Sequence, residues 1–406
     1  MRLPYFKNQM NFLSVLLVIL LFGCSYQPEN KATISNIPSL LDRNEKLRNG
    51  KEWDDVMNSY QKLKLAIQKN ENDQESKIRM AQLFIREARV TGEHGHYYNA
   101  ALSMTDQILN SKSTDRDMDF LALVTKAGVQ LSHHDFNGAL LTGQKAVAIN
   151  PNNPQIFGVL VDANVELGNY DEAIKMADIM IAMKPDLRSY ARISYIREIH
   201  GEVDQAIDAM KMAVEAGIPG YEDTAWAMLT LADMYKLFGK FDKAEALYKE
   251  ILAQRQNYPF AVAALGSVYM QKNDLTLAEK MTKDAIAIIP EVGFYTQLAE
   301  IYKKQGNTQA IDPLIHEIFT MMKDDEKTGH NMNLEYAHVY LDLLNNTDKA
   351  LEYAQKEYQK RPNNIDVNRI LARIYASENN KVMTKKYIAA AATTHSKHPE
   401  LKALSM

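Results

Sequence analysis

Apolar residues recur along most of the chain at intervals of three and four, in segments that short polar turns separate. This spacing places the apolar side chains on one face of a helix. The segments recur as well. Residues 133–151 and 167–185 have the same order of polar, small and apolar positions, and their final prolines, Pro151 and Pro185, are 34 residues apart. The pattern predicts a repeated pair of helices, because a fixed period of this length is typical of stacked helical repeats.

The period continues on both sides of these segments. Clear repeats cover residues 120–398, and two weaker repeats occupy residues 37–70 and 74–112. We place the clear repeats at residues 120–153, 154–186, 187–219, 225–258, 259–291, 292–325, 331–364 and 365–398. About ten repeats are therefore expected over residues 37–398, followed by a short tail at residues 399–406.

The residue sizes within each repeat resemble those of the tetratricopeptide repeat family. In that family small residues stand near the eighth, twentieth and twenty-seventh positions, where two helices approach closely, and large apolar residues fill positions between them. The clearest match, in residues 259–291, consists of Leu265, Gly266, Tyr269, Ala278, Ala285 and Pro290. The resemblance implies an all-α fold of about twenty helices, stacked as antiparallel pairs in a right-handed superhelical solenoid.

One weak repeat departs from this order. Ala81 and Ala101 are 20 residues apart, where the family has 12, so about eight residues are inserted near residues 91–100. We interpret the insertion as a loop between two helices, with Tyr97 and Tyr98 packed on the neighbouring repeat.

The resemblance also implies a binding surface. In tetratricopeptide repeat proteins a second stripe of each first helix, opposite the buried positions, lines the concave surface where peptide segments bind. On this chain the stripe includes Asp162 and selects as partner-binding candidates Arg188, Arg192, Tyr195, Trp226 and Phe260. Trp226 and Phe260 should stand side by side, and Arg188 and Arg192 could receive one carboxylate together. Alternatively, the aromatic residues complete the packing between repeats.

Charge and cysteine content narrow the function classes. The 47 Lys and Arg residues against 51 Asp and Glu residues give a formal net charge of −4, which does not provide the concentrated basic surface that nucleic acids need. Cys24 is the single cysteine, so the chain can form neither an intramolecular disulfide nor a multi-cysteine zinc site.

The first residues have the pattern of an export signal. Arg2 and Lys7 precede an apolar run from Phe12 to Phe22, and at about 11 residues this run is too short to span a bilayer. It ends in Leu-Phe-Gly-Cys, which resembles the lipobox of bacterial lipoproteins. In that family the signal peptide is cleaved before the cysteine, and the cysteine is acylated.

This second resemblance implies a signal peptide at residues 1–23, a lipid on Cys24 and a flexible tether at residues 24–36. Because Ser25 rather than an aspartate follows the cysteine, the resemblance implies the outer membrane of a bacterial cell envelope. The alternative is a plain secretory signal with an unmodified cysteine.

No catalytic motif is complete in the sequence. It contains no GxGxxG, GxxxxGK or GxSxG. His316 and Glu317 begin like the HExxH of zinc proteases, but Thr320 stands where the second histidine must be. We therefore expect no enzyme activity, no cofactor and no metal.

The insertion holds the densest group of unusual residues. His94 and His96, with Glu93 beside them, could bind a metal, but no third ligand has the spacing of a zinc site. His133 and His134 lie in the tight turn of the next repeat and could approach the insertion in space.

Two hypotheses of different classes result. The first is a membrane-anchored scaffold that binds a segment of another envelope protein in its concave groove. The second is a metal-binding or enzymatic envelope protein that uses His94 and His96.

Overall fold

The structure of the chain, a computed structural model, describes residues 37–111 and 115–405. The predicted signal peptide, Cys24 and the tether lie outside these residues. Within the described residues the regular elements are all helical, and none of the helices is both long and apolar enough to cross a bilayer.

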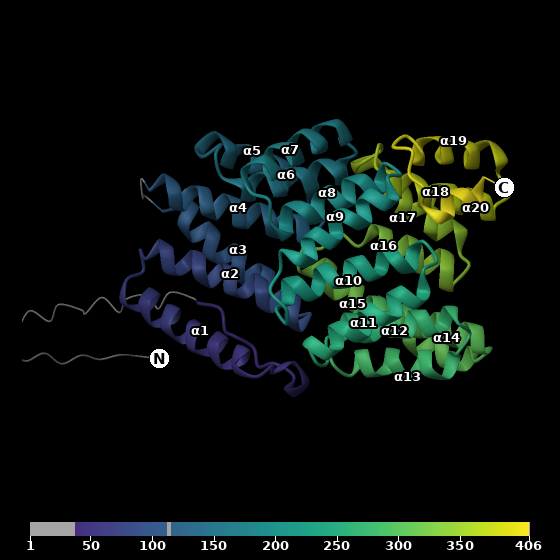
Figure 1. The fold of residues 1–406 in the computed structure, drawn as a ribbon, viewed down its shortest axis with the longest axis horizontal. Helices are drawn as coiled ribbons and strands as arrows, with labels where there is room; N and C mark the ends of the chain where they lie inside the picture. The colour runs from purple at the N-terminus through teal and green to yellow at the C-terminus, as the bar shows by residue number, and fades with distance from the viewer. Residues whose placement is uncertain (1–36, 112–114, 406) are drawn as a thin grey trace, which may run out of the picture. The chain divides into compact units, whose positions relative to one another are not determined.

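Twenty α-helices follow one another in the described part of the chain (Figure 1). Their bounds are α1 Lys51–Lys69, α2 Gln74–Thr91, α3 His94–Leu109, α4 Arg116–Ser132, α5 Phe136–Ile149, α6 Pro154–Leu167, α7 Tyr170–Met183, α8 Leu187–Ile199, α9 Val203–Glu215, α10 Glu222–Leu237, α11 Phe241–Gln254, α12 Pro259–Gln271, α13 Leu275–Ile286, α14 Val292–Gln305, α15 Ile311–Lys327, α16 Asn333–His338, α17 Thr347–Lys360, α18 Ile365–Ser377, α19 Lys381–Ala391 and α20 Pro399–Leu404. Short 3-10 helices lie at Glu45–Leu47 and Thr308–Ala310, and a π-helical turn at Val339–Leu343 follows α16.

Successive helices pack in pairs, from α2 with α3 to α18 with α19, and each pair stacks on the next. The predicted all-α solenoid of about twenty helices is confirmed. Helix α1 stands before the nine pairs, because residues 37–50 contain only a short 3-10 helix where a first helix was expected. Residues 399–404, expected as part of a tail, form α20, and its Leu401 is buried.

Small residues allow the two helices of a pair to approach closely. Ala278 and Ala285 on α13 are fully buried. A Cβ atom added at Gly266 on α12 would meet the Thr282 hydroxyl oxygen at 2.6 Å, which is far closer than atoms can pack. The order of small residues in the sequence therefore has a direct steric cause, namely the close contact between α12 and α13.

The predicted loop at residues 91–100 is wrong. Helix α2 runs on to Thr91, and α3 begins at His94, so the inserted residues lengthen two helices. The chain reverses at Gly92, whose φ of 74° is the left-handed conformation that glycine adopts without strain. Tyr97 and Tyr98 are buried on α3, which agrees with their predicted packing role.

The array curls back on itself, so segments about 200 residues apart lie in contact. The Asn331 carbonyl oxygen lies 2.9 Å from Nδ1 of His134, although the two residues are 197 positions apart. Ile365 packs in one apolar cluster with Val161 and Ile196. In Figure 1 the yellow-green helices α17 and α18 accordingly lie beside the teal helices of the middle of the chain.

A buried ion-pair network joins another two distant parts of the chain. The Arg43 guanidinium donates to both Glu87 carboxylate oxygens, at 2.8 and 2.7 Å, and both side chains are about 1% exposed. Arg43 also donates to Glu52, which in turn accepts two hydrogen bonds from Arg255. The network joins the first helices to the turn after α11, 203 residues further along.

Candidate partner-binding site

The predicted site residues come from α8, α10 and α12, the first helices of three successive pairs. Asp186 caps α8: its carboxylate accepts from the backbone N–H groups of Arg188 and Ser189, and its own N–H donates to the Ser189 hydroxyl oxygen. This reciprocal capping box fixes where the helix starts. As a result Arg188, Arg192 and Tyr195 follow one another on one face.

The two arginines of this face do not act as a pair. The Arg192 guanidinium donates through Nε to the Asp162 carboxylate at 2.9 Å and to the Gly158 carbonyl oxygen at 3.1 Å. A second nitrogen of Arg192 also bonds Asp162. Arg188 is exposed and makes no side-chain hydrogen bond or ion pair with a described residue. The predicted joint reception of a carboxylate therefore does not fit, because Arg192 already holds one from α6.

Tyr195 lies further along the same face and keeps 37% of its surface exposed. Burial, together with the negative charges of Asp366, Glu166 and Glu198, holds the pKa of the Tyr195 hydroxyl well above its usual range. Tyr195 is therefore accessible to solvent, although negative charges surround its hydroxyl group.

Trp226 and Phe260, which occupy equivalent positions, differ in their surroundings. Trp226 on α10 is 43% exposed. Phe260 on α12 is half-buried, and its ring packs on Tyr258 and Phe294 with centroid distances of 5.5 and 5.8 Å. The aromatic contacts of Phe260 are therefore with the adjoining turn and α14. Trp226 instead presents its ring to solvent.

A cavity of about 390 Å³ opens beside this face, between the turn and helices at α4–α6 and the returning helices α16–α18. Asp162, the partner of Arg192, lines it. The other lining residues are Leu131, His134, Phe136, Glu166, Asn331, Leu334, Glu335, Glu357, Arg361 and Asp366. Together with Asp162, five of the lining side chains are carboxylates against a single arginine, so the wall is mainly acidic.

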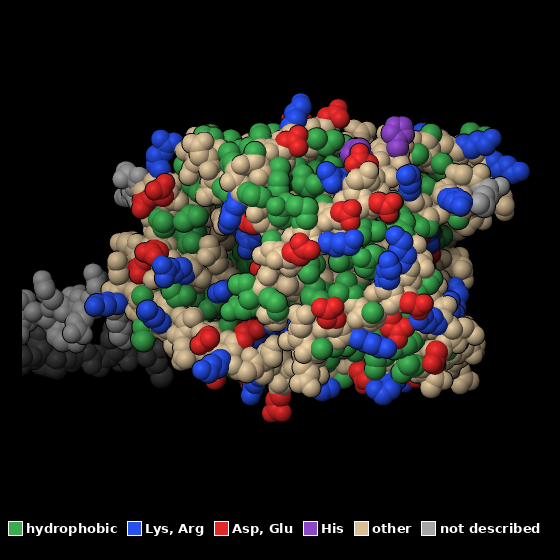
Figure 2. Space-filling view, in the orientation of Figure 1, with side chains coloured by type: hydrophobic (Ala, Val, Ile, Leu, Met, Phe, Trp, Pro, Cys, Tyr) green, Lys and Arg blue, Asp and Glu red, His purple; other side chains and the backbone are tan. Residues whose placement is uncertain are grey.

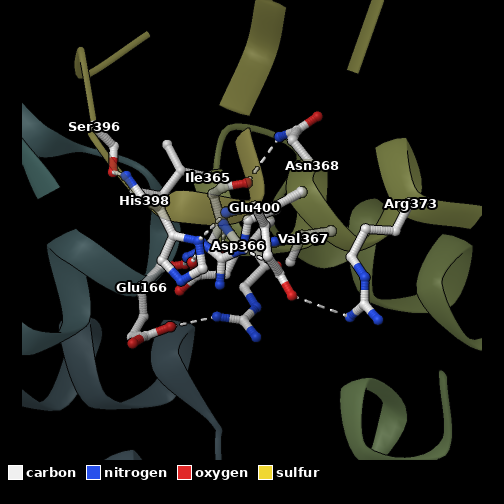
Figure 3. A network of polar contacts seen from close by, with 12 residues as sticks. Glu166, Ile365, Asp366, Val367, Asn368, Arg373, Ser396, His398 and Glu400 are labelled. Carbon is white, nitrogen blue, oxygen red and sulfur yellow. Dashed lines mark hydrogen bonds and ion pairs between the residues drawn. The ribbon is translucent and has the colours of Figure 1, made fainter. Parts of the chain in front are cut away.

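Arg361 stands at the centre of this wall and is 6% exposed. It donates to Glu357 through Nε at 2.6 Å and to Glu166, and its guanidinium carbon lies 4.7 Å from the centre of the Phe136 ring. In Figure 3 a dashed line joins the carboxylate of Glu166, on α6, to a neighbouring guanidinium group. The Glu166 carbonyl oxygen also accepts from the Asn364 side chain at 3.0 Å. These bonds join α6 to α17 and α18.

A second set of ion pairs continues from this wall to the C-terminal helix. Arg369 donates to Asp366 and to Glu400 of α20, and Arg373 donates to Asp342 and lies 3.7 Å from Glu400 (Figure 3). Helix α20 is thereby held against α18.

Several carboxyl groups near Tyr195 have raised pKa values. Burial, and then the charge of Asp366, raises the pKa of Glu198 to about 7. Burial also raises the pKa of Glu166, and the attraction of Arg361 does not cancel this effect. Carboxylates crowded in this way gain from the approach of a positive charge. Elsewhere, on the face that Figure 2 shows, positive and negative side chains are interspersed.

Apart from Asp162, sequence reasoning missed the carboxylates of the cavity and the arginines beside them, although a signal existed. Glu166 is the thirteenth residue of its repeat, and Asp366, Arg369 and Arg373 occupy the second, fifth and ninth positions of the repeat at 365–398. The stripe that selected Arg192 and Trp226 would have selected them too. Their meeting, however, depends on the return of the chain, which no local spacing records.

The structure separates the two histidines of the insertion. His96 lies with Nε2 2.8 Å from the Ser39 carbonyl oxygen and packs edge-on against Tyr97. His94 instead stacks on Tyr98, at a centroid distance of 5.4 Å. Among the described residues no group of three or more His, Cys, Asp or Glu side chains is arranged to hold a metal ion. The metal hypothesis based on His94 and His96 gains no support from this geometry.

Two stretches of the chain match models described as tetratricopeptide repeat, at residues 130–193 and 188–257. Residues 130–257 are tetratricopeptide repeats. They contain α5 to α11, and so the repeats carry four of the five predicted partner-binding residues, Arg188, Arg192, Tyr195 and Trp226.

The cellulose synthase operon protein C of Pseudomonas fluorescens (strain SBW25) is 26% identical to this chain over 150 residues, which are 35% of this chain and 11% of that protein. The chain thus spans a small part of that relative's length. Among solved structures, human IFIT1 with m7Gppp-AAAA aligns with 85% of this chain and 87% of its own, at 13% identity and a TM-score of 0.49. PilW, a widely conserved type IV pilus biogenesis factor, aligns with 51% of this chain and 93% of its own, at 18% identity and a TM-score of 0.41.

Proposed function

We propose that this protein is a membrane-anchored scaffold of the bacterial cell envelope, which binds a segment of a partner protein on its concave face. The observation that carries the proposal is the exposure of Tyr195 and Trp226, at 37% and 43%, on the first helices of two successive repeats. Exposed aromatic side chains beside charged groups are typical of binding surfaces, because they bury large areas at a small cost in rotamer freedom.

The charges near Tyr195 favour one kind of partner segment. Glu166, Glu198 and Asp366 all act on its hydroxyl group, and the neighbouring Arg192 is already neutralised by Asp162. A segment with lysine or arginine next to an apolar anchor would complement this surface. Arg188, which no carboxylate in the described part of the chain engages, would then lie at the rim of the contact.

Capture of a partner tests the binding surface. We expect membranes to yield a partner that binds the intact protein, and the Tyr195→Ala/Trp226→Ala double variant to lose it. Tyr221→Ala is the matched control, since Tyr221 is an aromatic residue at the start of α10 with 61% exposure and lies outside the predicted face. Equal capture by wild type and the double variant would refute the proposed surface.

The anchor is tested separately, at Cys24. The Cys24→Ser variant is expected to release the protein into the soluble fraction or to leave it unprocessed, because one or two acyl chains supply the anchoring energy at about 0.8 kcal/mol per buried methylene. Fractionation and metabolic labelling with a fatty acid measure this. A serine variant that partitions and migrates like the wild type would show that the cysteine carries no lipid.

A further inference from the structure

Four histidines from three separate parts of the sequence meet in one cluster. His94 begins α3, His133 and His134 lie in the turn between α4 and α5, and His330 lies in the segment between α15 and α16. The His330 ring centroid is 4.8 Å from His133, 5.7 Å from His134 and 6.1 Å from His94. Only the first three could be expected to meet from the sequence.

The cluster sits where the returning chain touches the early repeats. The Asn331 N–H donates to the His133 carbonyl oxygen at 3.1 Å, and the Asn99 side chain donates to the Thr328 carbonyl oxygen at 3.4 Å. Thr328 also fills the space beside Gly95, where an added Cβ would meet it at 2.6 Å. Residues 328–331 are thus held against α3 and the α4–α5 turn by a small number of hydrogen bonds, and the imidazole rings pack at this contact.

Two imidazole nitrogens in the cluster are buried without a hydrogen-bond partner, Nε2 of His133 and Nδ1 of His330. His133 is only 7% exposed. A neutral imidazole has a single N–H that needs an acceptor and tolerates an unpaired second nitrogen, whereas an imidazolium has two N–H donors and a charge to satisfy. The packing therefore accommodates the neutral rings and leaves the charged rings unsatisfied.

The titration of the cluster agrees with this geometry. Burial, reinforced by the neighbouring histidines, lowers the pKa of His330 to about 4 and also lowers the pKa values of His94 and His133. A histidine whose pKa is depressed by folding contributes stability above its unfolded pKa of about 6.5, and this contribution is lost as the pH falls toward the folded value.

Other titratable and charged groups surround the cluster, and the carboxylates among them oppose this effect in part. The surrounding groups are Arg89, Glu93, Tyr98, Asp135, Glu291, Asp325, Glu335, Glu357, Lys360 and Arg361. Burial raises the pKa of Glu291 to about 7 and that of Asp325 to about 6. These two carboxylates lose their charge over the same range, which favours the folded contact as the pH falls. The contribution of the histidines must therefore be measured by comparing wild type with a variant that lacks one of them.

We propose that His94, His133 and His330 form a proton-operated latch, which holds residues 328–331 against α3 and the α4–α5 turn while neutral and releases them when charged. His134 and Asn331 line both the cavity of about 390 Å³ and a neighbouring one of about 230 Å³. Release of the latch therefore opens the wall of the acidic cavity. The device acts within this chain and does not depend on the identity of a partner.

Hydrogen exchange on the full chain tests the latch. The probe is the opening constant of the Asn331 amide, which donates across the contact, after correction for the intrinsic exchange rate at each pH. We expect the ratio of this constant in wild type to that in His330→Gln to rise about tenfold from pH 7.5 to pH 5.5, as a shift of one pKa from 6.5 to about 4 requires. Glutamine cannot be charged, so its contact does not respond.

Two further variants keep the test decisive. His133→Gln should also raise this ratio at the lower pH, because burial lowers the pKa of His133 as well, and it replaces His330→Gln if that variant does not fold at pH 7.5. His316→Gln, on the exposed surface of α15, should behave like wild type at both pH values. The latch would be overturned if the ratio of the wild-type opening constant to that of the cluster variants stayed constant between pH 7.5 and 5.5. It would also be overturned if the ratio of wild type to His316→Gln rose as much as the ratio for the cluster variants.

Discussion

Replacement of Arg361 by alanine should lower the free energy of unfolding by about 3–5 kcal/mol, the range observed when one partner of a buried ion pair is removed. Arg361 is 6% exposed and serves two carboxylates, Glu357 and Glu166, from different turns of the array. Without the guanidinium, Glu357, which is 1% exposed, keeps only the hydrogen bonds from Asn331 and Asn333. Thermal melting and urea unfolding measure the loss.

A matched control and a rescue separate the lost charge from a general effect of truncation. Lys360→Ala, at the exposed neighbouring position, should change stability by about 0.5 kcal/mol or less. Replacing Glu357 and Glu166 by glutamine in the Arg361→Ala background should recover part of the loss, because no buried carboxylate then lacks a counter-charge. A loss below about 1 kcal/mol in Arg361→Ala would mean that the two turns do not depend on this network.

Replacement of Trp226 by alanine should weaken partner binding by about 2 kcal/mol or more, roughly a thirtyfold change in Kd. The reason is that a central tryptophan commonly anchors a bound segment. Stability should fall by only about 1 kcal/mol, since 43% of the side chain is already exposed. Affinity for the captured partner and the melting temperature of the same variant are the two measurements.

Phe260→Ala provides the contrast. Phe260 is half-buried among Tyr258, Phe294 and the apolar cluster that includes Leu47. Its truncation should therefore cost more stability than that of Trp226. A sharp fall in melting temperature for Trp226→Ala, with unchanged affinity, would end the binding hypothesis and assign that ring to repeat packing.

The fold was largely predictable, because its information is local. Residues such as Gly266 and Ala278 must be small where α12 and α13 touch, and this need repeats with the period of the helix pair. The insertion at residues 91–100 was not predicted correctly. The extra residues were assigned to a loop, but only Gly92 breaks a helix there, while Gly95 lies within α3 and makes room for Thr328.

Only part of the candidate site could be predicted from the sequence. The helical stripe placed Tyr195 and Trp226 on one surface, since positions along a helix follow from spacing. It did not show that Asp162 would neutralise Arg192, because the stripe gives the face on which a residue lies and not which side chains of neighbouring helices pair. Nor could it show that residues 37–50 would pack against α12 to α14, where Leu47 joins the cluster near Phe260.

The sequence by itself determined the helix pairs, their period and the face that each first helix presents, because these depend on residue size and on interactions within about 34 positions. The tertiary structure alone decided that the array closes on itself. Contacts such as Glu166 with Arg361, or His133 with His330, join residues almost 200 positions apart. They result from the small rotation between successive pairs, which accumulates over the whole stack and leaves no periodic mark in the residues that finally meet.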